Sequence, residues 1–261
     1  MWESRDPKSI GQLVNDQCAK WEGGMRTSQK LPRGDIYRPV LLLSGQVGTI
    51  ERAVAERLSA ELHMDLFAEE ILHAIAQEAH LSDRIVRTID ERGLTYAEEI
   101  LNRLTGKNGM SPEAYFRHLV RVIVAIGRQG NSIVMGHGAN YILQAPMNLR
   151  VRFVAPFHVR KRCMSEELGI SAEEAGRRIK ILDQERRDFV RQYFDTDIED
   201  VRHFDLMINN EFIDTDTAVR IVKDAFLGRN WNRANRRWRP KQRAEKEEGK
   251  HPDSEMETLG A

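Results

Sequence analysis

The sequence has little of what several classes of protein require. Its 261 residues include two cysteines, Cys18 and Cys163, which are too few for a disulfide framework and predict reduced thiols in a cytoplasmic protein. Neither cysteine lies beside histidines at metal-ligand spacing, which argues against a zinc site. No stretch approaches the roughly 18 apolar residues of a membrane span, and the N-terminus lacks the apolar segment of a signal peptide. We therefore expect a soluble protein without a membrane partner.

The sequence also lacks an excess of charge of one sign, with 40 Lys+Arg against 40 Asp+Glu. The basic residues nevertheless gather in one place, because residues 229–243 carry seven Lys/Arg and no acid, while residues 1–228 are mildly acidic. Trp231 and Trp238 lie within the basic segment, and aromatic rings among cations are typical of single-stranded nucleic-acid binding. The same composition is more often a disordered, solvated extension. Nucleic acid is therefore the less favoured partner.

Three segments of the chain differ in their patterns. Residues 1–38 combine one amphipathic helix, between Ile10 and Trp21, with a polar linker that contains glycine. Residues 39–228 form the predicted domain, and residues 229–261 form a charged tail. At roughly 150 residues per domain, a length of 261 allows one large domain with appendages.

Short apolar runs in the central segment predict the strands of a parallel sheet. The runs are residues 40–44, 66–67, 131–135, 149–155 and 206–209. Helical patterns separate them, which favours an α/β fold with helices on both faces of a five-stranded sheet. Two helix starts are also predicted, one at Ser111 and Pro112 and one at the capping box of Ser171 and Glu174. Ligands of such folds bind beyond the carboxyl ends of the strands.

The first predicted strand runs into a glycine turn, residues 44–52, with several features of a phosphate-binding loop. Gly45 and Gly48 let backbone N–H groups point at an anion, and Thr49 supplies a hydroxyl. The turn lacks the lysine of the usual pattern, and the carboxylate of Glu51 would repel a triphosphate. A second interpretation stays open, namely a tight strand-to-helix turn in which Thr49 caps the helix.

A second candidate is the arginine-rich helix that follows Ser171. Asp183, Arg186 and Arg187 stand at i, i+3 and i+4, a spacing that suits an element closing guanidinium groups over phosphates. The alternative is a solvated helix face, whose Asp183–Arg187 pair would contribute only ~0.3–0.5 kcal/mol.

A third candidate is the strand end at residues 136–140, Gly-His-Gly-Ala-Asn. Its two glycines permit the close approach of a ligand. The single histidine there, His137, is weak evidence for acid–base chemistry on its own.

Together, the three segments resemble the cytidylate kinase-like family of P-loop nucleoside monophosphate kinases. The similarity extends over residues 39–227. Its most specific parts are the G-x-G-A-N turn at residues 136–140 and the run A-x-x-R-I-x-x-x-D-x-x-R-R at residues 175–187. The resemblance implies a P-loop fold with a helical lid and an insert, at about residues 81–117, that binds the monophosphate.

The resemblance also implies ligands and site residues. The ligands are ATP with Mg²⁺ as cofactors and CMP or dCMP as the acceptor, with Thr49 the candidate contact for Mg²⁺ and no other metal. In the lid, the residues that handle phosphates are Arg160, Arg162, Asp183, Arg186 and Arg187. The loop residues that bind ATP are Ser44, Gly45, Gly48 and Thr49. The acceptor residues are His137, Gly138, Asn140 and Arg117.

Two departures from the family pattern bear on activity. The family's loop reads G-S-G-G, where this chain has Gly48-Thr49-Ile50-Glu51. The family's G-R-G-A-N turn has an arginine where this chain has His137, which is mostly neutral at pH 7. Phosphoryl transfer depends on positioning and charge stabilisation, so these changes predict reduced or lost activity. The alternative is a non-catalytic relative that binds a nucleotide or a partner protein.

Overall fold

The computed structural model describes residues 39–69, 97–102, 114–143 and 148–229, together with positions 19, 72, 75 and 76. The predicted helix of residues 10–21, apart from position 19, lies outside the described residues, as do the helix start at Ser111 and Pro112 and the tail after Arg229. Most of the predicted insert lies outside them as well.

Five parallel strands form the central sheet, which confirms the predicted fold class. They are β1 (Val40–Gly45), β2 (Asp65–Phe67), β3 (Ser132–Met135), β4 (Asn148–Val154) and β5 (Leu206–Asn209). The order across the sheet is β2-β3-β1-β4-β5, so β1 is the middle strand. Leu43 of β1 lies opposite Met135 of β3, and Ser44 lies opposite Arg152 of β4. The loop after β1 therefore leaves from the middle of the carboxyl edge.

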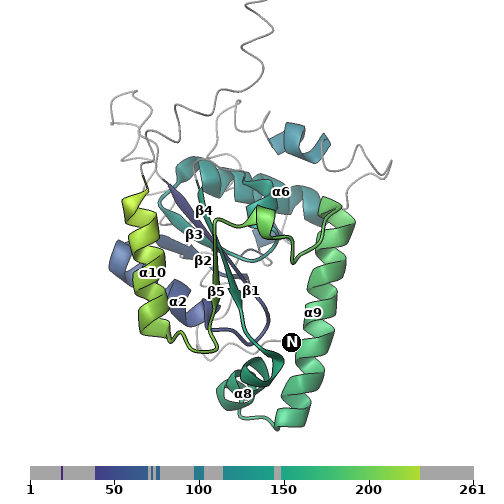
Figure 1. Ribbon diagram of the computed structural model, residues 1–261. Helices are drawn as coiled ribbons and strands as arrows, with labels where there is room; N and C mark the ends of the chain where they lie inside the picture. Colours follow the sequence, from purple (N-terminus) through teal and green to yellow (C-terminus); the bar gives the residue numbers. More distant parts are fainter. Residues whose placement is uncertain are drawn as a thin grey trace, which may run out of the picture.

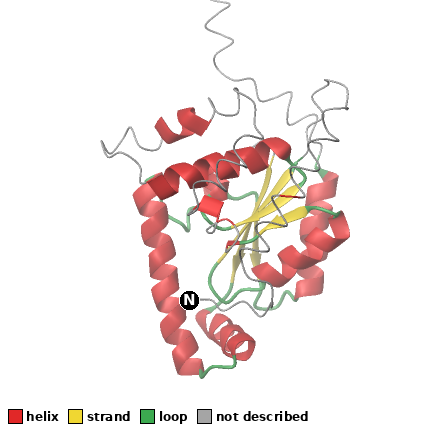
Figure 2. Cartoon of the chain, turned by 180° about the vertical axis from the view of Figure 1, so that it is seen from behind, coloured by secondary structure: helices red, strands yellow, loops and turns green. Residues whose placement is uncertain are grey.

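Helices cover both faces of the sheet (Figures 1 and 2). They are α2 (Glu51–Leu62), α6 (Ala114–Gln129), α7 (Ala139–Ile142), α8 (Phe157–Leu168), α9 (Ala172–Phe194) and α10 (Thr215–Gly228), with a 3₁₀ turn at Val201–His203. The side chains of α2 and α10 pack on one face, and those of α6 pack on the other. None of the described helices is long and apolar enough to cross a lipid bilayer.

Strand β1 is buried on both faces because its apolar residues alternate between two cores. Leu41 and Leu43 face the core shared with α2 and α10, whereas Val40 and Leu42 face the core shared with α6. Each of the four is at most 2% exposed, and burying such a side chain is worth about 1.5–3 kcal/mol. This is the pattern of a parallel strand covered on both sides.

Helices α8 and α9 form a hairpin, in which α8 lies beyond the carboxyl edge of the sheet and α9 runs from there back along the side of the sheet to α6 (Figure 1). Ser171 caps α9, because its hydroxyl accepts a hydrogen bond of 3.2 Å from the N–H of Glu174. The second half of the predicted capping box is wrong. The Glu174 carboxylate binds Arg177 and Arg178 of the next turn and does not return to the backbone of Ser171.

A small apolar core attaches this hairpin to the loop after β1. Val47 of the loop packs with Met164 of α8 and with Ala175 and Ile179 of α9, and all four are buried. This core is separate from the two that line the faces of the sheet. The loop and the hairpin are therefore held together by apolar contact in addition to polar bonds.

Candidate functional site

The loop between β1 and α2 is closed by Thr49. Its hydroxyl donates a hydrogen bond of 2.8 Å to the carbonyl of Gln46, and its N–H bonds to the same oxygen at 3.2 Å. The residue that caps α2 is Ile50, and no side chain accepts from the first turn of the helix. The interpretation in which Thr49 caps α2 is therefore wrong. An uncapped helix N-terminus favours an anion through its N–H groups and its dipole.

The carboxylate of Glu51 occupies the space above the end of β1. A Cβ atom on Gly45 would lie only 2.4 Å from Glu51 Oε2, so a larger residue at position 45 would collide with the acid. Glu51 is 7% exposed, and its Oε1 has no hydrogen-bond partner among the described residues. In this structure, Gly45 makes room for a side chain of the protein itself.

The surroundings of Glu51 favour its neutral form. Burial and the nearby Glu69 carboxylate together raise the pKa of Glu51 to about 7, against the opposing effect of the Arg186 and Arg152 guanidinium groups. A substantial fraction of the molecules therefore carries an uncharged Glu51 at neutral pH. The repulsion of phosphate expected from the sequence is correspondingly weaker below pH 7.

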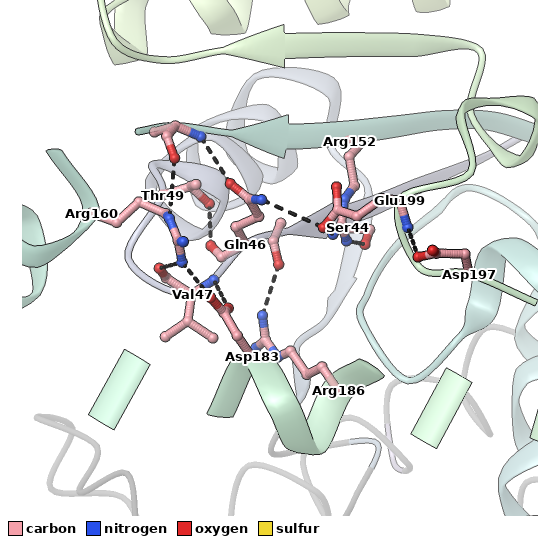
Figure 3. A network of polar contacts seen from close by, with 12 residues as sticks. Ser44, Gln46, Val47, Thr49, Arg152, Arg160, Asp183, Arg186, Asp197 and Glu199 are labelled. Atoms are coloured by element: carbon pink, nitrogen blue, oxygen red, sulfur yellow. Dashed lines mark hydrogen bonds and ion pairs between the residues drawn. The ribbon is translucent and has the colours of Figure 1, made fainter. Parts of the chain in front are cut away.

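Arg186 connects α9 to the loop. Its Nη1 donates to the carbonyl of Gly45 at 2.8 Å. Its Nη2 donates to both carboxylate oxygens of Glu69, at 2.7 and 2.8 Å. The guanidinium therefore lies at the mouth of the loop, held by a residue that follows β2 (Figure 3 shows its bond to the loop).

Asp183 and Arg160 fasten the hairpin to the loop. Arg160 Nη1 donates to Asp183 Oδ2 at 2.8 Å and to the carbonyl of Val47 at 3.1 Å (Figure 3). Asp183 Oδ1 accepts from the N–H of Val47 at 3.4 Å. The Asp183–Arg187 pair of the solvated-face interpretation is wrong, because Arg187 bonds to the amide oxygen of Gln184. Asp183 therefore pairs with Arg160 of α8 and not with Arg187 of its own helix.

Gly48 allows α8 to approach the loop. Its φ is +84°, and a Cβ atom there would lie 2.6 Å from the carbonyl oxygen of Arg160. Both the backbone angle and the close contact exclude a side chain at this position. Gly48 therefore serves the packing of the lid against the loop.

The turn after β3 holds His137 by both ring nitrogens. Nε2 lies 2.8 Å from the carbonyl oxygen of Glu69, and Nδ1 lies 3.5 Å from the hydroxyl of Tyr115. The carbonyl can only accept, so Nε2 carries a proton. Burial raises the pKa of Tyr115 to about 12, so its hydroxyl keeps its proton. These contacts hold the ring of His137 between the residue that follows β2 and helix α6.

The remaining predicted site residues, among them three for the acceptor, do not form one cluster with the loop. Gly138 begins α7 with φ of +70°, and a Cβ atom there would meet the ring of Phe194 at 2.4 Å. Asn140 is buried, and its Nδ2 has no partner among the described residues. Arg162 is exposed on α8 and Arg117 is half-buried on α6. Within the described part of the chain, no hydrogen bond or ion pair joins either arginine to the loop.

Four residues of the site were missed by the analysis of the sequence. They are Gln46, Glu69, Arg152 and Glu199. Arg152 is 2% exposed, and its Nη1 donates to the hydroxyl of Ser44 at 2.7 Å (Figure 3). A signal was available, because an arginine interrupts the apolar strand and Ser44, on the neighbouring strand, precedes the loop.

The pocket between the loop and α9 is rich in arginine. It is lined by Gly45, Gln46, Arg152, Asp183, Arg186, Arg187, Ile198 and Glu199. No group of three or more His, Cys, Asp or Glu side chains within the described ranges could hold a metal ion. Mg²⁺ that arrives with a nucleotide needs only one or two protein ligands, so Thr49 stays the predicted contact.

The fold and the site together define an α/β protein of the P-loop kinase type, with an arginine-bearing hairpin above the loop. The model of the Cytidylate kinase-like family matches residues 40–211, which is more than half of the chain. The protein belongs to this family, and the resemblance seen in the sequence is confirmed.

Several known proteins are similar to this chain. The cytidylate kinase of Ignicoccus hospitalis is 25% identical over 191 residues, which cover 72% of this chain and 99% of that protein. The cytidylate kinase of Pyrococcus horikoshii is 26% identical over 141 residues, which cover 50% of this chain and 73% of that protein. An uncharacterized protein from Eubacterium ventriosum has a solved structure with a TM-score of 0.58, 17% identity, and coverage of 74% and 99%. At that identity, the structural likeness shows the fold alone.

Proposed function

We propose that this protein transfers a phosphoryl group from ATP to a pyrimidine nucleoside monophosphate, CMP or dCMP. The observation that carries the proposal is the position of Arg186, which reaches from the lid helix to the carbonyl of Gly45 at the mouth of the loop. A guanidinium group at that place is able to stabilise charge on a transferring phosphoryl group. Residues 39–228 are the unit to which we assign this activity.

The residues present fit the phosphates of a nucleotide. Arg152, Arg186 and Arg187 line one pocket, and such a set of guanidinium groups suits an anion. Mg²⁺, when bound with ATP, neutralises part of the phosphate charge, and the Thr49 hydroxyl oxygen is the loop group that suits it. The N-terminus of α2 supplies backbone N–H groups to the same place.

Two carboxylates must change state for the loop to accept ATP. Glu51 binds a proton, which its raised pKa of about 7 favours near neutrality. Glu69 releases Arg186, which then turns toward the nucleotide. Both steps cost free energy, so we expect weak ATP binding and slow turnover. CMP or dCMP is proposed as the acceptor because the curated relatives carry the name cytidylate kinase.

A second candidate function is favoured by the ion pairs of the site. Three guanidinium groups around the loop already face carboxylates of the same chain. The pairs are Arg160–Asp183, Arg186–Glu69 and Arg152–Glu199. Because these carboxylates already neutralise the arginines, the arrangement suits a non-catalytic relative. Such a relative binds a nucleotide weakly, or a partner protein, through the same scaffold.

A coupled assay of ADP release tests the proposal. We expect release that depends on CMP or dCMP and is slower with UMP or AMP. Arg186→Ala should lower kcat on the order of 10²-fold, because it removes a group that stabilises charge in the transition state. Arg177→Ala is the matched control, because Arg177 lies on the same helix, is 66% exposed and, among the described residues, pairs only with Glu174. No turnover of folded wild-type protein with any of the four acceptors would favour the non-catalytic alternative.

A further inference from the structure

Arg152 is a buried cation whose bonds within the protein are incomplete. It stands in the middle of β4, is 2% exposed and packs over the ring of Phe204 at 5.5 Å. Its Nη1 donates to Ser44 and its Nη2 donates to Glu199 at 3.2 Å, but its Nε has no partner among the described residues. A guanidinium withdrawn from water is costly unless its N–H groups are bonded.

The missing bond lies on a particular edge of the group. Nε and Nη2 form the edge of a guanidinium that binds two oxygens of one carboxylate or phosphate. In Arg152, only Nη2 of this edge is used, and it is used by one oxygen of Glu199. That same oxygen also accepts from Gln46 Nε2 at 3.5 Å. Glu199 therefore bonds to only one of the two nitrogens of this edge, and its oxygen is shared with Gln46.

A neighbouring arginine shows what complete pairing looks like in this strand. Arg150 points to the same face of β4, two residues earlier. Its Nε and Nη2 both donate to the carboxylate of Asp205, at 3.2 and 2.9 Å, and Asp205 also accepts from its backbone N–H. The side chain of Asp205 is 23% exposed, whereas that of Glu199 is 47% exposed. Glu199 is thus the weaker and more easily displaced partner.

The position of Arg152 is that of a ligand contact. It lines the pocket between the loop and α9 together with Arg186 and Arg187. Ser44, which it binds, belongs to the strand that leads directly into the loop. The acids that line the pocket are Asp183, which is bound to Arg160, and Glu199.

We infer that Arg152 is a phosphate-binding residue of this site and that Glu199 stands in for a phosphate oxygen. An incoming phosphate group displaces Glu199 into solvent and accepts from both Nε and Nη2. The bond to Ser44 holds the guanidinium plane in place during the exchange. The inference rests on the proposed function, because it assigns a contact of the same nucleotide site. The phosphate belongs either to the polyphosphate of the donor or to the monophosphate of the acceptor.

Titration calorimetry on the full chain tests this assignment, with inorganic tripolyphosphate and CMP as separate probes. Arg152→Met should weaken the binding of one probe at least tenfold, and the probe affected identifies the source of the phosphate. Glu199→Gln should strengthen binding of the same probe severalfold, because a competing carboxylate has lost its charge. Arg150→Met is the control on the same strand and face, and it should leave both affinities unchanged.

Opposite effects of the two main variants separate ligand binding from a structural role. If Arg152 binds the phosphate, Glu199→Gln should strengthen binding only while Arg152 is present, so an equal gain in the Arg152→Met background overturns the inference. Wild-type affinity in a folded Arg152→Met or Arg152→Lys variant overturns it as well. So does the absence of binding of both probes to the wild type and to Glu199→Gln. Tripolyphosphate binding through Arg152 without turnover of CMP would support the inference and refute the kinase activity.

Discussion

Both carboxylate oxygens of Glu69 lie within 2.8 Å of Nη2 of Arg186, so the lid helix is fastened to the residue that follows β2 by two charge-assisted bonds. This pair stands across the mouth of the loop, because Nη1 of the same guanidinium bonds to Gly45. A phosphate group and the Glu69 carboxylate are therefore competitors for one arginine.

Neutralising Glu69 should release that arginine to a ligand. We expect Glu69→Gln to increase ATP affinity severalfold, as measured by calorimetry at pH 7.5. The control is Glu61→Gln on α2, because Glu61 and its partner Lys223 are each 35% exposed and lie outside the site. An unchanged or lower affinity in Glu69→Gln would show that the pair holds the site in its binding form.

The ionisation of Glu51 should make the stability of the protein depend on pH. Its pKa is raised from 4.5 to about 7 in the folded state, so the folded state holds the proton more tightly than the unfolded chain. This contribution is fully present below about pH 4.5 and is lost as pH rises through about 7, with a total on the order of 3 kcal/mol. Glu51→Gln should therefore have a higher melting temperature than the wild type at pH 8 and show little gain at pH 5. Parallel melting curves at all pH values would contradict this.

The close contact at Gly48 should make its replacement costly. Gly48→Ala combines a φ of +84° with a Cβ atom 2.6 Å from the backbone oxygen of Arg160. We expect a loss in the free energy of unfolding of about 2–4 kcal/mol, measured by urea denaturation. Gly169→Ala is the matched control, because its φ is +64° and no atom lies within 4 Å of its Cβ position. That variant should lose only about 1 kcal/mol. Equal losses would mean that the contact with α8 relaxes.

The bond between Arg160 and Asp183 should behave as a buried ion pair. The side chains are 9% and 15% exposed, and removing one partner of such a pair costs about 3–5 kcal/mol. We expect Arg160→Met and Asp183→Asn each to lower the free energy of unfolding by about 3 kcal/mol and the double variant to lose less than the sum. The exposed Arg177–Glu174 pair should yield under about 0.5 kcal/mol in the same cycle. Additive losses at Arg160 and Asp183 would rule out direct coupling.

The strands could be predicted from the sequence because their apolar runs are short, dense and bounded by helical patterns. Residues 206–209 were predicted as a strand and form β5 with the same bounds. The run predicted at residues 149–155 forms β4 at Asn148–Val154, one residue earlier at each end. At its first residue, Asn148 pairs with Val40, where β1 begins. The ends of a strand are set by its hydrogen bonds to the neighbouring strand. The sequence of one segment does not show which neighbour it pairs with or in which register.

The polar contacts of the site could be predicted less well. The spacing of Asp183, Arg186 and Arg187 pointed to α9 as part of the site, but i, i+4 spacing predicted a pair within the helix where α8 supplies the partner. Arg152 was missed because an arginine in a strand is usually exposed, and its burial depends on the loop at Glu199 and on Phe204. Both errors concern partners distant in sequence that only the tertiary fold brings together.

The packing of Val47 makes one way of opening the site to a nucleotide costly, namely the separation of the hairpin from the loop. Swinging the hairpin away would expose Val47, Met164 and Ile179 to water, at about 1.5 kcal/mol or more for each side chain. Such an open form would be populated in fewer than about one molecule in a thousand, even before the buried ion pair is broken. Apolar packing therefore opposes the separation of the hairpin from the loop. On the opposite rim, the ion pair of Arg186 and Glu69 is partly exposed, so parting these two side chains costs less than opening this apolar core.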